Sequence, residues 1–205
     1  MSSATDATDA RGRLVLVRHG QTEWSRDGRH TGRTDVPLTD AGERDARGLT
    51  TRLAEFDFAL VLCSPLSRAR RTAELAGLVP QEDLDLLEWD YGGYEGLSTP
   101  DIRDRLGDPG WTVFDDGVVA GATPGETVEE VAARASRVLV RVQEPLANGD
   151  VALVAHGHLL RILAATYLRQ DARFGAQLLL DAGALSVLDS EHGVPGIRSW
   201  NETVR

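Results

Sequence analysis

Three short runs of branched apolar residues limit what this chain can fold into more than any other feature. Residues 14–17 (LVLV), 59–63 (ALVLC) and 151–155 (VALVA) are continuously apolar, which is typical of strands buried on both faces of a sheet. Residues 184–188 provide a fourth candidate strand. Strands of this kind occur mainly in parallel sheets that helices cover on both sides. The chain is therefore expected to contain a buried, mostly parallel sheet.

Helical segments are expected between these strands. Residues 39–53 carry apolar side chains at helical spacing, and a threonine or an aspartate is available as the cap. Residues 67–75 and 159–168 are also predicted to be helical, and residues 127–130 (TVEE) fit a capping box before a long apolar stripe. Strands that alternate with helices predict a three-layer α/β/α fold.

Residues 90–125 break this pattern, because glycine, proline, tryptophan and acidic residues are concentrated there. We expect a small irregular insert that forms a lid over the functional site. Residues 1–12 are polar and acidic and are expected to be flexible. No linker or internal repeat divides the sequence, so residues 1–205 are predicted to form a single domain.

The charge balance argues against a nucleic-acid partner, because phosphate backbones attract basic surfaces and the formal net charge here is -10. All 22 basic residues are arginine, and an anionic ligand would need a local cluster of them. Cys63 is the only cysteine, which excludes an internal disulfide. No apolar run resembles a signal peptide or a membrane span. We expect a cytoplasmic protein that does not associate with membranes.

Basic side chains stand where the predicted strands end. Arg18 and His19 follow the first strand, Arg68 comes just after the second, and His156 follows the third. Ligands of open α/β sheets bind beyond the carboxyl ends of the strands, so these side chains are expected to share one pocket. Two arginines and two histidines suit a phosphoryl group, with one neutral imidazole as the nucleophile.

Other interpretations of these residues are less consistent with the sequence. Each residue alone is more often an ordinary surface or hydrogen-bonded group, and only the shared position at strand ends favours a site. A metal hydrolase that uses His156 and His158 would need carboxylate ligands at suitable spacing, which the sequence lacks. A serine hydrolase would need a G-x-S-x-G elbow, which is also missing. We expect neither a metal nor a cofactor.

The same residues lie in motifs that resemble those of the histidine phosphatase superfamily, which includes phosphoglycerate mutases. The segments are LVLVRHG followed by QTEW, then GRTDVPLTDAG, CSPLSRARRTA, LEWDYGGYEG and AHGHL. They occur in this order between residues 14 and 168, which covers most of the chain. The resemblance implies a phosphoglycerate-mutase-like fold.

The resemblance also implies roles for individual residues. His19 would be phosphorylated, and Glu88 would protonate the leaving alcohol and then act as base on water. Glu95, in the same motif as Glu88, is the weaker candidate for the acid. The transferred phosphoryl oxygens would be held by Arg18, Arg68 and His156. No metal would be needed.

A second group of residues matches substrate-contacting positions of the family or lies beside its motifs. These residues are Gln21, Ser25, Thr31, Gly32, Tyr91 and Gly157. The alternatives are a simple turn at Thr31 and Gly32, and a packed aromatic at Tyr91. Gln21 stands where the family more often has glutamate, and Ser25 stands where the mutases typically have asparagine.

The resemblance favours hydrolysis over mutase activity, because the insert is short and acidic where mutases carry a longer, more basic one. The motifs look most like those of the acid phosphatase and sugar-bisphosphatase branches. We expect a phosphomonoesterase that acts on a small phosphorylated metabolite; the alternatives are a mutase-type phosphotransferase and a non-catalytic phosphate-binding module. Arg103 and Arg105 either meet a second phosphate or face solvent. Dimers are common in the family, so a homodimer is possible on this resemblance.

Overall fold

The computed structural model describes residues 12–203, and its centre is a six-stranded sheet in the order β3-β2-β4-β1-β5-β6. The strands are β1 (Leu14–Arg18), β2 (Phe58–Cys63), β3 (Gln81–Glu82), β4 (Asp150–Ala155), β5 (Leu185–Glu191) and β6 (Val194–Glu202). β1 to β4 run parallel to one another, whereas β5 and β6 are antiparallel to their neighbours. The mostly parallel sheet is confirmed.

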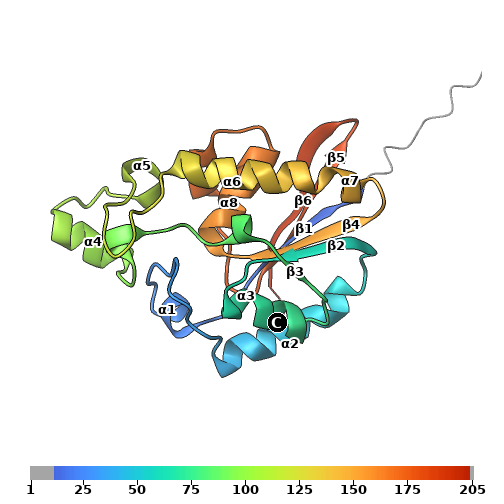
Figure 1. The fold of residues 1–205 in the computed structure, drawn as a ribbon, viewed down its shortest axis with the longest axis horizontal. Helices are drawn as coiled ribbons and strands as arrows, with labels where there is room; N and C mark the ends of the chain where they lie inside the picture. The colour runs from blue at the N-terminus through green and yellow to red at the C-terminus, as the bar shows by residue number, and fades with distance from the viewer. Residues whose placement is uncertain (1–11, 204–205) are drawn as a thin grey trace, which may run out of the picture.

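Helices cover both faces of this sheet, as Figure 1 shows. α2 (Asp40–Leu53) and α3 (Ser67–Leu75) pack on one face, whereas α6 (Val128–Arg141) and α8 (Gly157–Tyr167) pack on the other. Alternate residues of β1 point to opposite faces of the sheet. Val15 and Val17 pack on the side of α2 and α3, and Leu14 and Leu16 pack on the side of α6 and α8. The three-layer α/β/α prediction is confirmed.

Local sequence signals explain where the long helices begin. Thr39 precedes α2 and its side chain accepts a hydrogen bond from the backbone N–H of Gly42. Thr127 precedes α6 in a capping box with Glu130, as the sequence predicts. Three other helices are short: α1 (Glu23–Arg26), α7 (Gln143–Leu146) and the 3₁₀ helix η3 (Ala172–Gln177).

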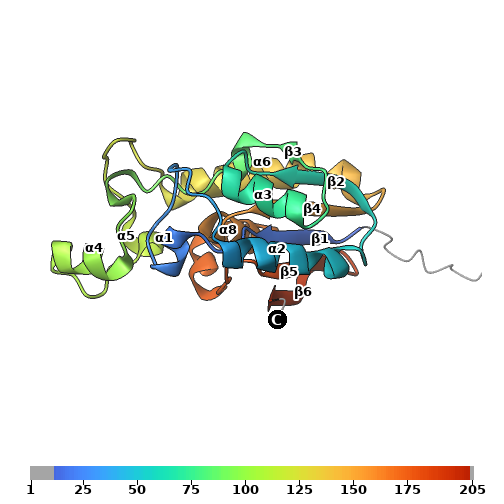
Figure 2. The same ribbon diagram turned by 90° about the horizontal axis from the view of Figure 1, so that it is seen from below.

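The insert at residues 90–125 is less irregular than the sequence indicates. It contains α4 (Thr99–Leu106), α5 (Val113–Asp116) and a short 3₁₀ helix, η2 (Gly92–Tyr94), preceded outside it by η1 (Leu84–Leu86). α4 forms because Ser98 and Asp101 make a capping box and a proline occupies its first turn. Figures 1 and 2 place α4 and α5 at one end of the molecule.

Two strands were not expected from the sequence. β3 has only two residues, and β6 mixes polar residues with Pro195 and Gly196, so neither carries an apolar run. Both lie at the edges of the sheet, where burial does not impose such a run. The predicted flexible segment, residues 1–12, lies outside the described residues except for Gly12, whose backbone N–H donates to the carbonyl of Leu146.

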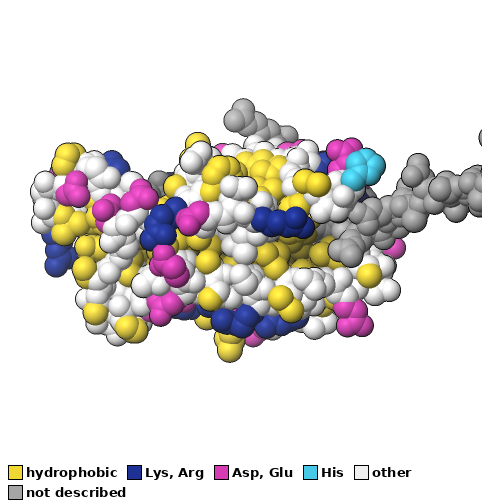
Figure 3. Space-filling model, turned by 90° about the horizontal axis from the view of Figure 1, so that it is seen from above, with side chains coloured by type: hydrophobic (Ala, Val, Ile, Leu, Met, Phe, Trp, Pro, Cys, Tyr) yellow, Lys and Arg dark blue, Asp and Glu magenta, His cyan; other side chains and the backbone are white. Residues whose placement is uncertain are grey.

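The surface over α6 carries arginine and acidic side chains side by side rather than in blocks of one sign (Figure 3). Ion pairs that involve residues of α6 include Arg137 with Asp85 and Arg173 with Glu129. Within residues 12–203, no helix is both long enough and apolar enough to span a bilayer.

Candidate active site

His19 and His156 lie beside each other because their strands are neighbours. β1 and β4 pair with Arg18 opposite Ala155, so each histidine directly follows the paired end of its strand. The centroids of the two imidazole rings are 5.1 Å apart. The structure thus brings together the two histidines at the carboxyl edge of the sheet, as the sequence predicts.

His19 is held in one tautomer. Its Nδ1 lies 2.8 Å from the carbonyl oxygen of Gly20, which can only accept, so Nδ1 carries the proton. Burial, with the charges of Arg68 and Arg18, holds the pKa of His19 well below its ordinary value, and the ring is neutral. The other nitrogen, Nε2, therefore has a free lone pair in the pocket that His19 lines.

Arg18 lines the same pocket and carries an unused donor. Its Nη1 donates to the carbonyl oxygen of Leu180, whereas its Nε is buried and has no hydrogen-bond partner among the described residues. Gly157 makes room for this guanidinium, because a Cβ at that position would lie 3.2 Å from the Arg18 Cζ. A buried cation with an unsatisfied N–H favours the binding of an anion.

Arg68 and His156 lie behind the pocket and are fully buried. The Nε of Arg68 donates to His156 Nδ1 at 3.2 Å, so His156 Nε2 carries the proton and donates to the Ser64 hydroxyl at 2.7 Å. The Nη groups of Arg68 donate to the carbonyl oxygens of Thr31, Gly32 and Thr34. Neither residue lines the pocket, and their predicted contact with phosphoryl oxygens would compete with these bonds.

Glu88 enters the pocket at the start of α8. Its Oε1 accepts hydrogen bonds from the backbone N–H groups of Trp89 and Leu159, both at 2.9 Å, and its Oε2 accepts one from His158 at 3.1 Å. The bonds from His158 and Leu159 satisfy N–H groups that lack partners within α8. They also fix the carboxyl group, and Oε2, with only one bond, is the oxygen that can exchange a proton.

The structure distinguishes Glu88 from its competitor Glu95. The carboxylate of Glu95 accepts from the backbone N–H groups of Gly32 and Thr34 and does not line the pocket. Gly32 has no room for a side chain, because a Cβ there would lie 2.5 Å from the Trp89 carbonyl oxygen. Glu95 therefore holds a loop in place, and Glu88 is the carboxyl group that reaches the site.

The pocket around these groups has a volume of about 240 Å³. The predicted residues that line it are Arg18, His19, Ser25, Thr31, Glu88, Tyr91 and Gly157. Two predicted substrate contacts, Gln21 and Gly32, are not among its lining residues. Gln21 instead accepts a hydrogen bond from the Thr39 hydroxyl, which ties the loop after β1 to the start of α2.

Sequence reasoning missed half of the lining. The additional residues are Gly28, Arg29, His30, Thr99, His158, Arg161 and Leu180. The sequence places His30 next to Thr31 and Gly32, and His158 next to Gly157, so adjacency to a motif was the available signal for these two. Thr99 and Leu180 come from distant segments and offered none. Arg103 and Arg105 do not line the pocket, and Arg103 donates to the Trp111 carbonyl oxygen.

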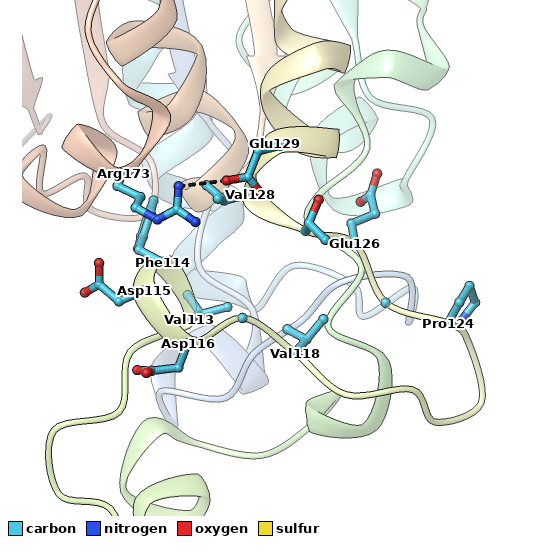
Figure 4. A pocket seen from close by; sticks show the side chains of 13 residues that line it. Val113, Phe114, Asp115, Asp116, Val118, Pro124, Glu126, Val128, Glu129 and Arg173 are labelled. Carbon is cyan, nitrogen blue, oxygen red and sulfur yellow. Dashed lines mark hydrogen bonds and ion pairs between the residues drawn. The ribbon is translucent and has the colours of Figure 1, made fainter.

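Another cavity, of about 300 Å³, lies between α5 and the start of α6 (Figure 4). Its charged lining is mainly carboxylate, with Asp115, Asp116 and Glu129, and its arginine, Arg173, is paired with Glu129. It contains no histidine and lacks the chemistry described above. Within residues 12–203, no cluster of three or more histidine, cysteine or acidic side chains is arranged to hold a metal ion.

Comparison with known proteins identifies the family. The profile of the histidine phosphatase superfamily (branch 1) matches residues 14–203. The chain belongs to the histidine phosphatase superfamily. The motif that ends β1 with Arg18 and His19, and the pocket beyond it, are therefore those of a histidine phosphatase.

Relatives of this histidine phosphatase carry names from the same superfamily. An acid phosphatase of Mycobacterium tuberculosis is 40% identical over 185 residues, which covers 89% of this chain and 88% of the relative. A sedoheptulose 1,7-bisphosphatase of Saccharomyces cerevisiae is 36% identical over 191 residues, which covers 76% of this chain and 67% of the relative. The solved structure of the open reading frame Rv3214 from M. tuberculosis aligns with a TM-score of 0.88 at 38% identity. The alignment covers 95% of this chain and 99% of that structure's chain. These relatives support a phosphomonoesterase.

Proposed function

We propose that this histidine phosphatase hydrolyses phosphomonoesters of small metabolites, such as sugar phosphates, through a phosphohistidine intermediate at His19. The observation that carries the proposal is that two residues lining one pocket each keep an unused group. His19 has an unprotonated Nε2, and Arg18 has a buried Nε–H without a partner among the described residues. A nucleophile beside an unsatisfied cationic donor suits a phosphoryl group.

In the first step, His19 Nε2 attacks phosphorus and the bond between phosphorus and the ester oxygen breaks. The leaving oxygen takes a proton from Glu88, whose Oε2 has the free position. The imidazole becomes positively charged as the new P–N bond forms. The Gly20 carbonyl oxygen, 2.8 Å from Nδ1, stabilises this charge through the Nδ1–H donor.

In the second step, water replaces the alcohol. The Glu88 carboxylate accepts a proton from the water as its oxygen bonds to phosphorus, and the P–N bond breaks. Phosphate leaves, His19 regains its free Nε2, and Glu88 is again protonated for the next ester. Arg18 remains in contact with the phosphoryl oxygens through both steps and offsets their charge.

The names of the relatives support a small phosphorylated metabolite as the substrate, since they include a sugar bisphosphatase and an acid phosphatase. A pocket of about 240 Å³ also suits a small molecule. We further propose that the protein acts in a reducing compartment such as the cytoplasm, since its single cysteine, Cys63, is buried and free.

The test uses p-nitrophenyl phosphate between pH 4 and pH 8, with and without a chelator. Wild type should release phosphate under both conditions, and His19→Ala should release none. The control is His192→Asn, since His192 is exposed on the β5–β6 turn, outside the pocket. After rapid quenching of the reaction, the peptide that contains His19 should carry a phosphoryl group that acid removes, as a phosphohistidine would. Undiminished activity in His19→Ala would refute the mechanism.

A further inference from the structure

One side of the active-site pocket is lined by polar rings and a hydroxyl that the proposed chemistry does not use. We call His30, Tyr91, Thr99 and His158 the polar wall; all four line the pocket. They are packed together: the His30 ring centroid lies 4.7 Å from that of Tyr91 and 5.8 Å from that of His158. The Thr99 hydroxyl lies 3.3 Å from His30 Nε2. Such a wall presents hydrogen-bonding groups beside the reacting phosphate.

Tyr91 fixes the tautomer of His158. The Tyr91 hydroxyl lies 2.5 Å from His158 Nδ1. Burial, with the charges of Glu88 and Glu95, raises the pKa of Tyr91, so the phenol keeps its proton and donates it to Nδ1. Burial, with Arg161, lowers the pKa of His158, so the ring is neutral. The remaining proton therefore sits on Nε2.

The Nε2–H of His158 is available to a ligand. It makes no hydrogen bond to any of the described residues, and it is not among their buried unpartnered atoms. His158 lines the pocket, and we infer that this donor is open to a substrate there. Since its hydrogen-bond position is fixed by Tyr91, the donor is preorganised and loses little freedom on binding.

His158 also lies next to the proposed acid. Its backbone N–H donates to Glu88 Oε2 at 3.1 Å, which is the oxygen that would protonate the leaving alcohol. We infer that the ring of the same residue borders the part of the pocket that would hold the alcohol rather than the phosphoryl group. An acceptor oxygen on the alcohol, close to the ester, is the partner that such a donor requires.

We propose that His158, held by Tyr91, is a specificity-determining residue that donates its Nε2–H to a hydroxyl oxygen of the substrate alcohol, so that the site selects phosphate esters of polyols over those of simple alkyl alcohols. This inference rests on the proposed phosphatase activity. Arg29 and Arg161 also line the pocket, but the donors of the polar wall itself are neutral, so we assign a hydroxyl rather than a carboxylate as their acceptor. An alkyl ester would leave the Nε2–H desolvated without a partner, which lowers kcat/KM.

The test compares glycerol 3-phosphate with n-propyl phosphate, which lacks both hydroxyls. Wild type should prefer glycerol 3-phosphate in kcat/KM by roughly 10- to 100-fold. His158→Phe keeps a ring but removes the donor, and the preference should fall to near one. His158→Gln restores an N–H donor and should recover part of it. Tyr91→Phe removes the hydrogen bond that keeps the His158 proton on Nε2, and should lower the preference for glycerol 3-phosphate to an intermediate value.

Two matched variants serve as controls. His192→Asn changes an exposed histidine remote from the pocket, and Tyr94→Phe changes a buried tyrosine that does not line the pocket. Both should keep the wild-type preference. An equal loss on both esters in His158→Phe would indicate a purely structural role and overturn the inference.

The outcomes separate the inference from the proposed function. If wild type hydrolyses both esters equally well, or if His158→Phe keeps the full preference, the specificity role is wrong while the phosphohistidine mechanism stands. If wild type hydrolyses neither ester and no His19 phosphoenzyme forms, the proposed function fails and the inference falls with it.

Discussion

Replacing Arg134 by methionine tests how the segment that carries Glu88 is held. Arg134 projects from α6 and is only 8% exposed. Its Nε and Nη2 donate to the two carboxylate oxygens of Glu126 at 2.7 and 2.9 Å. Its Nη1 donates to the carbonyl oxygens of Asp85 and Leu87, each at 2.8 Å. One guanidinium therefore joins α6 to the backbone that leads into the site.

The expected loss follows from what remains when the guanidinium is removed. Methionine keeps a long apolar stem and a high helix propensity, so the change acts mainly on the ion pair and the carbonyl bonds. Removing one partner of a buried ion pair costs about 3–5 kcal/mol. Glu126 keeps Arg33 at 3.2 Å and the backbone N–H of Asp90 at 2.9 Å, so we expect about 3 kcal/mol. For a chain of this size that lowers Tm by roughly 6–12 °C.

Thermal denaturation at neutral pH measures this loss, and Arg137→Met is the matched control. Arg137 lies three residues further along the same helix and pairs with Asp85 at the surface, where its side chain is 56% exposed. Its replacement should leave Tm nearly unchanged, because solvent screens exposed pairs. An equal fall in Tm for the two variants, or no fall for Arg134→Met, would refute the reasoning.

Three further predictions concern the site. Glu88→Gln should lower kcat for an alkyl phosphate by about 10²- to 10⁴-fold but much less for p-nitrophenyl phosphate, whose leaving group needs little protonation; equal losses in steady-state assays would contradict this. Gly157→Ala crowds Arg18 and should raise KM, and Ki for inorganic phosphate, about tenfold. Burial lowers the pKa of four histidines, to about 4 for His30, so below pH 6.5 the unfolded chain binds protons that the folded chain does not. Between pH 7 and pH 5.5 the free energy of unfolding should fall by on the order of 1 kcal/mol per histidine, and His30→Gln should remove about a quarter of this pH dependence in urea titrations. The four are His19, His30, His156 and His158.

The sequence predicted the layers of the fold because its signals are local. Central strands such as β1 and β4 are apolar except for one charged residue at an end, and the caps before α2 and α6 sit next to the helices that they begin. β6 shows the limit of this reasoning. It lies at the sheet edge, so its residues need not be apolar, and its sequence carries no strand pattern.

The sequence placed His19 and His156 together for a similar reason, since both end buried parallel strands. It could not show that Arg68 lies beneath the pocket with its donors already bound to Thr31, Gly32 and Thr34. Nor could it bring Thr99 into the site. That residue begins α4, inside a segment whose path over the pocket depends on tertiary packing.

The junction between β4 and α8 places three consecutive residues in three different parts of the site. His156 has an extended backbone, and its ring lies beside that of His19. Gly157 has no side chain, which leaves the space that the Arg18 guanidinium fills. His158 then gives its backbone N–H to Glu88 and its ring to the polar wall. As at the start of any α-helix, the first N–H groups lack partners within the helix, and those of His158 and Leu159 hold the acid. We therefore expect that inserting one residue into this turn would move the Glu88 anchor and the His158 ring away from His19 and abolish activity.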